Sequence, residues 1–431
     1  MHGLLEHVLV FHGSPNPVFS LLDERSAKAH KRSETLAPDT FRQETKEWLE
    51  RVAPPALRGT RRGRFDGFWG GRHPEGATVD EREWLSVMSE RGWTAPTWPK
   101  EYGGGGLSRP NAKILESLLA ELELPPPLVG FGLAMIGPTL LDYGTEEQKR
   151  EHLPAICRGE IRWCQGYSEP GAGSDLASLQ TKAVANDEYY TVNGQKVWTS
   201  HADKSDWIFC LVRTDPNAKK QEGITFLLID MASQGVSTEK IQLISGASPF
   251  CEVFFDEVRV PRRNVIGQEN QGWTVAKALL GYERSMIGEA MGGQLAGAEE
   301  RLVALAKDYL NYDTGQLPDA ALRQEIAQYA IEEQAFRLTL EKVGQEMKAG
   351  HAPGSESSIL KICGSELKQK NWELAMRLAG PHGNAWDGEE EDDDALERTR
   401  EWLRSRANTI EGGTTEIQLN IIAKRVLNLP S

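Results

Sequence analysis

The sequence predicts an α+β protein that is mostly helical and is built in three consecutive parts. Helical periodicity dominates up to about residue 160, short runs rich in β-branched and aromatic residues follow, and helical periodicity then returns. Strands do not alternate with helices, which argues against a Rossmann or a TIM-barrel architecture. We therefore expect an N-terminal helical domain at 38–160, a middle β-domain at 161–270 and a C-terminal helical domain at 271–431, after an irregular extension at 1–37.

Local signals in the two helical parts indicate where helices begin and which faces they bury. Thr40 with Gln43, and Thr145 with Gln148, match the capping box, in which two side chains satisfy free backbone N–H groups at a helix start. An acidic run resists packing because like charges repel, so we expect a surface loop at 387–394. One long helix carries an apolar stripe on a single face, as in a helical bundle. Its members are Leu322, Ile326, Tyr329, Phe336, Leu340, Val343 and Met347.

The middle part reads as a series of short strands. Asn193-Gly194 is typical of a two-residue turn and lies between the runs 189–192 and 195–198, so we expect a β-hairpin there. Short strands at this spacing favour a small antiparallel barrel or sandwich. Further strands are expected at 207–212, 223–229 and 253–260.

Composition narrows the class of protein. The chain has 431 residues, of which 39% are hydrophobic and 26% charged, as in a soluble globular protein. Its net charge of -14 argues against nucleic-acid binding, and no apolar run reaches the roughly 18 residues that membrane insertion requires. The five cysteines are scattered without a CxxC pair, and no HExxH motif occurs. We therefore expect a cytoplasmic protein without structural disulfides or a bound metal.

Two segments of the middle part are candidates for chemistry. The stretch from Tyr167 to Asp175 places small residues and hydroxyls around a Pro-Gly turn, and the stretch from Lys196 to Ser200 places an indole beside two hydroxyls. Such a pair can hold a flat aromatic cofactor and hydrogen-bond its polar edge, which indicates a flavin enzyme. The alternative is that both segments are turns beside a core tryptophan.

At these residues the chain resembles the acyl-CoA dehydrogenase family, in particular a bacterial branch that is often heteromeric. The resemblance covers residues 40–430. It implies a C-terminal four-helix bundle behind the other two domains, and FAD at their junction with its adenosine half reaching a neighbouring subunit. The further motifs that carry it run from Gly92 to Pro99, Gly144 to Lys149, Asn193 to Lys196, Val258 to Pro261 and Gly412 to Gln418.

The resemblance also implies roles for individual residues. Trp198 is expected to cover one face of the flavin, and Ser200 to hydrogen-bond near its N5 atom. Ser174 is expected to contact the pantetheine arm of CoA. The complete set for FAD is Gln165, Gly166, Tyr167, Ser168, Trp198, Thr199, Ser200, Thr414, Thr415 and Glu416, and the set for the substrate is Ser174, Arg284 and Gly413.

The catalytic base needs a separate argument, because removal of an α-proton from a thioester requires a carboxylate within hydrogen-bond reach. Many family members place this glutamate directly before Gly-Thr in the last motif, but Gly412 stands there in this chain and Glu411 comes one residue early. Other branches place it before an arginine on the helix after the β-domain, where this chain has Glu283-Arg284. We expect Glu283 to be the base, with its pKa raised by burial. The alternatives are that Glu283 is an ordinary surface carboxylate, or that Glu411 takes the role.

The implied activity is FAD-dependent oxidation of an acyl-CoA to a trans-2-enoyl-CoA, with hydride transfer to flavin N5 and electrons passing to an electron-transfer flavoprotein. Residues 306–312 lack the Arg-x-x-Phe-Gly pattern whose arginine clasps the FAD diphosphate. This departure fits a heterotetramer with a sister subunit as well as a homo-oligomer, and a bulky substrate such as a steroid. Two alternatives are a non-catalytic or half-site partner subunit, and an oxidase that uses O2 on the same fold.

Overall fold

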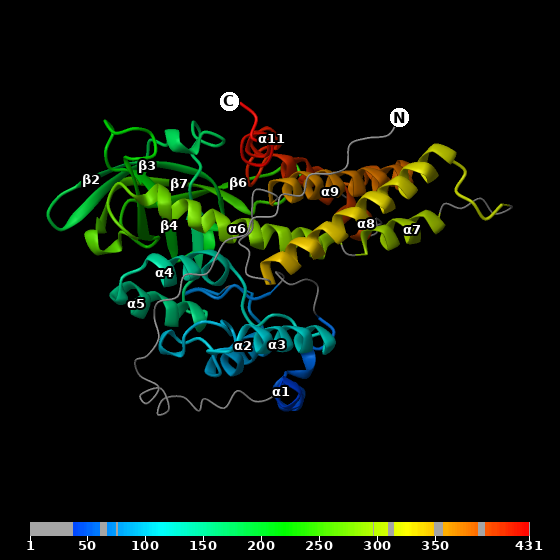
Figure 1. Ribbon diagram of the computed structural model, residues 1–431, viewed down its shortest axis with the longest axis horizontal. Helices are drawn as coiled ribbons and strands as arrows, with labels where there is room; N and C mark the ends of the chain where they lie inside the picture. The colour runs from blue at the N-terminus through cyan, green and yellow to red at the C-terminus, as the bar shows by residue number, and fades with distance from the viewer. Residues whose placement is uncertain are drawn as a thin grey trace, which may run out of the picture.

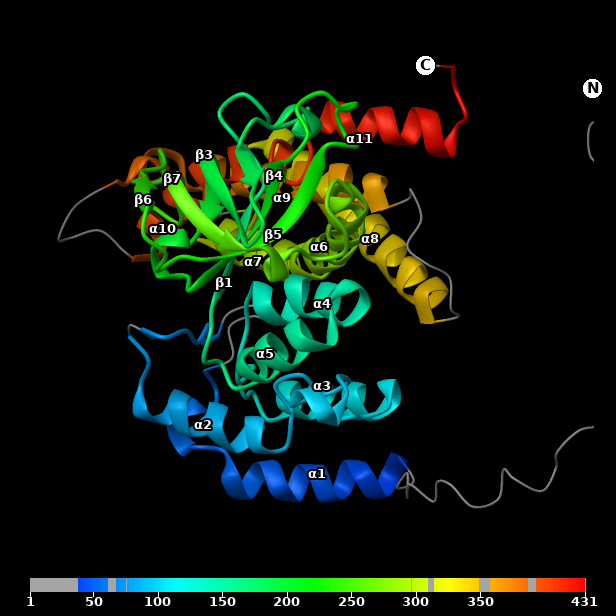
Figure 2. The same cartoon turned by 90° about the vertical axis from the view of Figure 1, so that its left-hand side faces the viewer.

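The computed structural model arranges the chain in three regions that follow the sequence order (Figure 1). The strand-rich region lies against the N-terminal helices, and long C-terminal helices extend away from it (Figures 1 and 2). The expected extension at 1–37 and most of the expected acidic loop lie outside the residues that the structure describes. Those residues are 38–60, 67–74, 76–295, 297–308, 314–348, 357–386 and 393–430.

In the N-terminal region the first three helices pack around Trp84, Met88 and Leu118, and the later ones pack in a core that they share with the β-domain. The capping box predicted at Thr145 is confirmed. The one predicted at Thr40 is wrong, because α1 already begins at Pro38, a residue type that suits the first turn of a helix. The elements are α1 (Pro38–Val52), α2 (Val79–Glu90), α3 (Arg109–Glu121), the π-helical turn η3 (Gly132–Ile136), α4 (Gly137–Tyr143) and α5 (Glu146–Cys157).

The middle region is one curled, seven-stranded sheet in the order β1-β4-β2-β3-β7-β6, with β5 on the other side of β4. Most pairings are antiparallel, as expected, but β4 pairs in parallel with β1 and β2. Alternate residues of β4 enter different cores, with Phe209 on one face and Cys210 on the other. The strands are β1 (Trp163–Gly166), β2 (Lys182–Ala185), β3 (Tyr189–Ser200), β4 (Trp207–Arg213), β5 (Ile224–Asp230), β6 (Val236–Ile241) and β7 (Phe250–Pro261).

The hairpin predicted at Asn193-Gly194 is wrong. Strand β3 runs through both residues and stays paired with β7, with a register shift between Val192 and Gly194. Gly194 has φ of +151°, and a Cβ atom there would lie 2.7 Å from Thr181. The glycine therefore permits a β-bulge and a close backbone approach instead of a chain reversal. The reversal comes earlier, where the Asn186 side chain accepts backbone hydrogen bonds from the next turn.

The C-terminal region consists of long helices packed around α9, which contacts α6, α7, α8 and α10. The stripe predicted on α8 is confirmed for six of its members, which are buried in or packed against one core; the Met347 side chain lies outside the described residues. Helix α6 also packs against β5 and η3, so it joins the sheet to the bundle. No described helix is long and apolar enough to cross a membrane. The helices are α6 (Gly272–Leu295), α7 (Ala298–Lys307), α8 (Ala320–Lys348), α9 (Ser357–Ala379), α10 (Asp393–Ser405) and α11 (Thr415–Ile421).

Candidate active site

The candidate base lies against the first strand of the sheet. Glu283 is half-buried on α6, and its Oε2 atom accepts a hydrogen bond of 3.1 Å from Nε2 of Gln165 on β1. Gln165 is itself held in register by the parallel pairing of β1 with β4. Two residues that are 118 positions apart in the chain are thus brought together at the junction of sheet and bundle. The Glu283 carboxylate is therefore tied to the β-domain.

Tyr167 supplies a second polar group on the same side. Its ring is buried and packs edge-on against both Phe209 and Phe226, and no described residue hydrogen-bonds to its hydroxyl. Burial, and after it the negative charge of Glu283, raise the pKa of Tyr167 well above its usual value. The phenol is therefore a neutral hydrogen-bond donor in the field of the Glu283 carboxylate.

The stretch from Lys196 to Ser200, called here the Trp198 segment, lies beside the stretch from Tyr167 to Asp175, called here the Ser168 segment. The N–H of Val197 donates to the carbonyl of Ser168 at 2.9 Å, which ties the two together. Trp198 has φ of +60° within a register shift of β3, and its side chain is 55% exposed. Next to it the Thr199 hydroxyl is buried without a hydrogen-bond partner among the described residues, and Ser200 pairs with Phe250. An exposed indole face beside hydroxyls of this kind can accommodate a flat ring with a polar edge.

A buried ion pair supports both segments. Lys196 is fully buried, and its Nζ donates to Oε1 of Glu169 at 2.8 Å and to the carbonyl of Tyr167 at 3.1 Å. Glu169 also accepts the N–H groups of Gln180 and Thr181. Burial alone would raise the pKa of Glu169, but Lys196 and these donors outweigh burial and hold the pKa below its usual value. Sequence reasoning assigned no role to this pair, although a lysine and a glutamate inside two otherwise small or apolar segments were a visible signal.

The C-terminal motif carries the remaining predicted contacts, Gly413 to Glu416. Gly412 and Gly413 both have positive φ, +65° and +93°, and they lead into α11, where the Thr414 hydroxyl accepts the N–H of Ile417. The rival base Glu411 is engaged elsewhere, because Arg404 donates to its carboxylate at 2.7 Å and Asn408 at 2.5 Å.

A chain of contacts connects this motif to the Trp198 segment. The Arg404 guanidinium lies 5.5 Å over the ring of Phe250, which packs edge-on against Trp198 at 6.1 Å. Of the other predicted contacts, Thr415 is half-buried, while Glu416 and Ser174 are exposed. The side chain of Arg284 lies outside the described residues.

Sequence comparison decides the family. Models of the N-terminal, middle and C-terminal domains of acyl-CoA dehydrogenases match residues 39–160, 164–258 and 270–427. The chain belongs to the acyl-CoA dehydrogenase family. Members of this family are flavoproteins whose usual cofactor is FAD, and the protein is a flavin-dependent oxidoreductase.

Several acyl-CoA dehydrogenases are similar over most of the chain. IpdE1 of Mycobacterium tuberculosis is 38% identical over 362 residues, which cover 84% of this chain and 90% of that protein. FadE34 of the same organism is 37% identical over 83% of this chain, which spans only 47% of the length of FadE34.

Solved structures of this family include heteromeric complexes. The Tcur3481-Tcur3483 steroid acyl-CoA dehydrogenase matches with a TM-score of 0.72 and 30% identity, over 91% of this chain and 97% of that one. The ChsE4-ChsE5 complex from Mycobacterium tuberculosis matches with a TM-score of 0.70 and 29% identity, over 93% of this chain and all of that one.

Proposed function

We propose that the protein binds FAD and dehydrogenates an acyl-CoA thioester between its α- and β-carbons, with Glu283 as the base. The observation that carries the proposal is the hydrogen bond between Gln165 and Glu283, which joins the bundle carboxylate to the strand expected to line the flavin. The engagement of Glu411 by Arg404 and Asn408 supports the choice of Glu283 over its rival.

Each residue has a distinct role in the proposed reaction. Gln165, Ser168, Trp198 and Ser200 would hold FAD, which would supply the acceptor for the hydride of the β-carbon. Glu283 takes the α-proton of the bound thioester, and Gln165 orients its carboxylate for this step. The high pKa of Tyr167 keeps its phenol protonated at neutral pH, so it does not compete for that proton.

The test is replacement of Glu283 by Gln, with Glu411→Gln as the matched control. General-base catalysis contributes about 10²- to 10⁴-fold to rate, so we expect anaerobic flavin bleaching by acyl-CoA to slow by that factor in Glu283→Gln only. Bleaching at the wild-type rate in Glu283→Gln would rule out this residue as the base. A loss confined to Glu411→Gln would transfer the role to Glu411.

We further propose that the protein works in a heteromeric assembly on a bulky, steroid-like acyl group. Support comes from the likeness to the steroid acyl-CoA dehydrogenase and to the ChsE4-ChsE5 complex, and from the missing Arg-x-x-Phe-Gly pattern at 306–312. Native mass spectrometry with and without candidate sister subunits, counting FAD, tests the assembly. A chain that purifies alone with one FAD per subunit and turns over acyl-CoA would exclude the half-site alternative, and slow reoxidation of its flavin in air would exclude an oxidase.

A further inference from the structure

A cavity of about 180 Å³ lies between the loop after α1 and the start of the β-domain. Trp69 and His73 line it from the loop, Glu81 from α2, Arg162 from the residue before β1, and Lys204 from the turn after β3. A neighbouring cavity shares Trp69 and Arg162 but measures only about 10 Å³, which is room for one water at most. A ligand larger than water therefore belongs in the larger space, called here the Trp69–Arg162 cavity.

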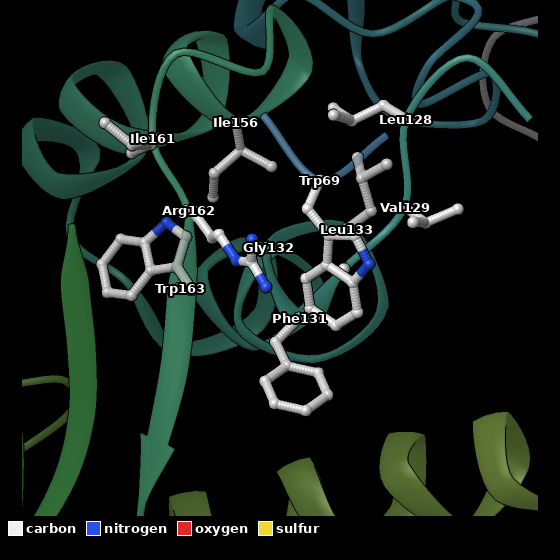
Figure 3. A pocket seen from close by; sticks show the side chains of 11 residues that line it. Trp69, Leu128, Val129, Phe131, Gly132, Leu133, Ile156, Ile161, Arg162 and Trp163 are labelled. Atoms are coloured by element: carbon white, nitrogen blue, oxygen red, sulfur yellow. The ribbon is translucent and has the colours of Figure 1, made fainter. Parts of the chain in front are cut away.

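Arg162 is the unusual member of this lining. Its guanidinium stacks on the Trp69 ring at 4.5 Å, and Figure 3, which shows the smaller neighbouring cavity, has it between Trp69 and Trp163. Its Nε atom is buried, and within the described residues the guanidinium makes no hydrogen bond or ion pair. A buried charged donor without an acceptor is costly, and in native proteins it usually indicates a missing water or ion.

Other arginines of the same region show that this is specific to Arg162. Arg72 forms a two-pronged pair with Asp230 at 2.9 and 2.8 Å. Arg213, which is as buried as a core residue, donates to the carbonyls of Ala177, Leu179 and Lys220. Both of these arginines therefore find acceptors within the protein.

The nearest carboxylates do not fill this gap. Asp206 is buried, and its Oδ2 atom accepts the backbone N–H groups of Arg162 at 2.7 Å and of Arg72 at 3.0 Å. Asp206 therefore fixes the backbone at Arg162 and at the residue before His73 without bonding to the guanidinium. Glu81 is engaged in the capping box with Thr78. Burial lowers the pKa of Arg162, and Asp203 and Asp206 only partly oppose that effect.

The side chains that line the cavity indicate which class of ligand would fit it. A guanidinium fork matches the paired oxygens of a carboxylate or phosphate, and His73 and Lys204 are the other basic side chains of the lining. Since a water takes up about 30 Å³ in the liquid, the cavity has room for a group the size of phosphate. We propose that the Trp69–Arg162 cavity binds a small oxyanion, a phosphate or carboxylate group, through the Arg162 guanidinium.

Calorimetric titration of the purified full-length protein tests the proposal. Sodium phosphate and sodium acetate are added separately in a chloride buffer at constant ionic strength. We expect saturable one-site binding, with affinity at least about tenfold lower in Arg162→Met, because a charge-assisted hydrogen bond is removed. The control Arg109→Met removes an exposed arginine of α3 and should bind like wild type. Binding of phosphate alone or of acetate alone identifies the group, and either result supports the site.

Thermal unfolding of the same variants separates binding from folding. Arg162→Met removes an uncompensated charge, so without ligand it should unfold at or above the wild-type temperature, and phosphate or acetate should stabilise only the wild type. If Arg162→Met does not fold, Arg162→Lys carries the test, because lysine lacks the planar fork and should bind severalfold more weakly. Absence of saturable binding of both anions, or wild-type affinity in the variant tested, would overturn the proposal. None of these readouts depends on the dehydrogenase activity.

Discussion

The two sides of the candidate active site are held in different ways. On the β-domain side, Lys196 and Glu169 form an ion pair whose side chains are 0% and 7% exposed. On the C-terminal side, the pair of Arg404 and Glu411 leaves 23% and 37% of its side chains exposed. Water can replace a lost partner more readily in the second pair. Breaking the ion pair on the β-domain side should therefore lower the stability more than breaking the pair on the C-terminal side.

The same contrast separates the two candidate glutamates. The Glu283 carboxylate accepts a hydrogen bond from the Gln165 amide of the β-domain, and the Glu411 carboxylate accepts from the Arg404 guanidinium and the Asn408 amide of the C-terminal region. Glu283 is thus tied to β1, whereas Glu411 is tied to α10.

The largest difference in stability is expected between Lys196→Met and Arg404→Met. Removing Lys196 leaves a buried, unpaired carboxylate, which costs about 3–5 kcal/mol, whereas removing Arg404 breaks a partly exposed pair worth less than about 1 kcal/mol. Urea unfolding followed by circular dichroism measures both. Equal losses in the two variants would contradict the contrast between the two sides.

The next largest effect is expected from Gln165→Leu. The Gln165 amide donates to a charged group, a bond worth about 1.5–3 kcal/mol, so flavin reduction by acyl-CoA should slow about 10- to 100-fold. Gln418→Leu is the control on the C-terminal side, because the Gln418 amide donates to the neutral carbonyl of Gly412. Anaerobic stopped-flow absorbance compares the two rates, and an equal or larger loss in the control would speak against an orienting role for Gln165.

Two glycines give a smaller, local comparison. A Cβ atom at Gly194 would meet the backbone of Thr181 at 2.7 Å, while at Gly413 it would meet the flexible end of the Gln418 side chain at 2.6 Å. We expect Gly194→Ala to cost about 2–3 kcal/mol and Gly413→Ala about 1 kcal/mol. Thermal unfolding of both variants checks the order, which would be refuted if Gly413→Ala were the more destabilised.

The smallest effect is expected from pH and concerns Glu169. Its folded-state pKa lies below the unfolded value near 4.5, so its ionised form stabilises the protein above that pH, and this contribution is lost as the pH falls through the folded pKa. The gap in melting temperature between wild type and Glu169→Gln should therefore narrow below about pH 4.5. A gap that stays constant from pH 7 to pH 3 would show that the charge of Glu169 does not contribute.

The sequence predicted the elements that depend on local patterns. The apolar stripe of α8 was found because its spacing is that of one buried helix face, and the strands at 207–212 and 223–229 were found because they are short apolar runs that are buried on both faces. The hairpin prediction at Asn193-Gly194 was wrong because turns and β-bulges favour the same residue types. Only the pairing of β3 with β7 distinguishes them. The Lys196–Glu169 pair was not assigned, since its value depends on burial that no local pattern reports.

The amino-acid sequence by itself determined the order of helical and strand-rich parts, the family, and the two glutamates that could serve as base. Only the tertiary structure decided that Glu283 meets Gln165 across 118 positions, that Glu411 is occupied by Arg404, and that Arg162 faces a cavity with no acceptor for its charge. The physical reason is that periodicity and turn chemistry act over a few residues, while the partner of a polar side chain depends on how distant segments pack.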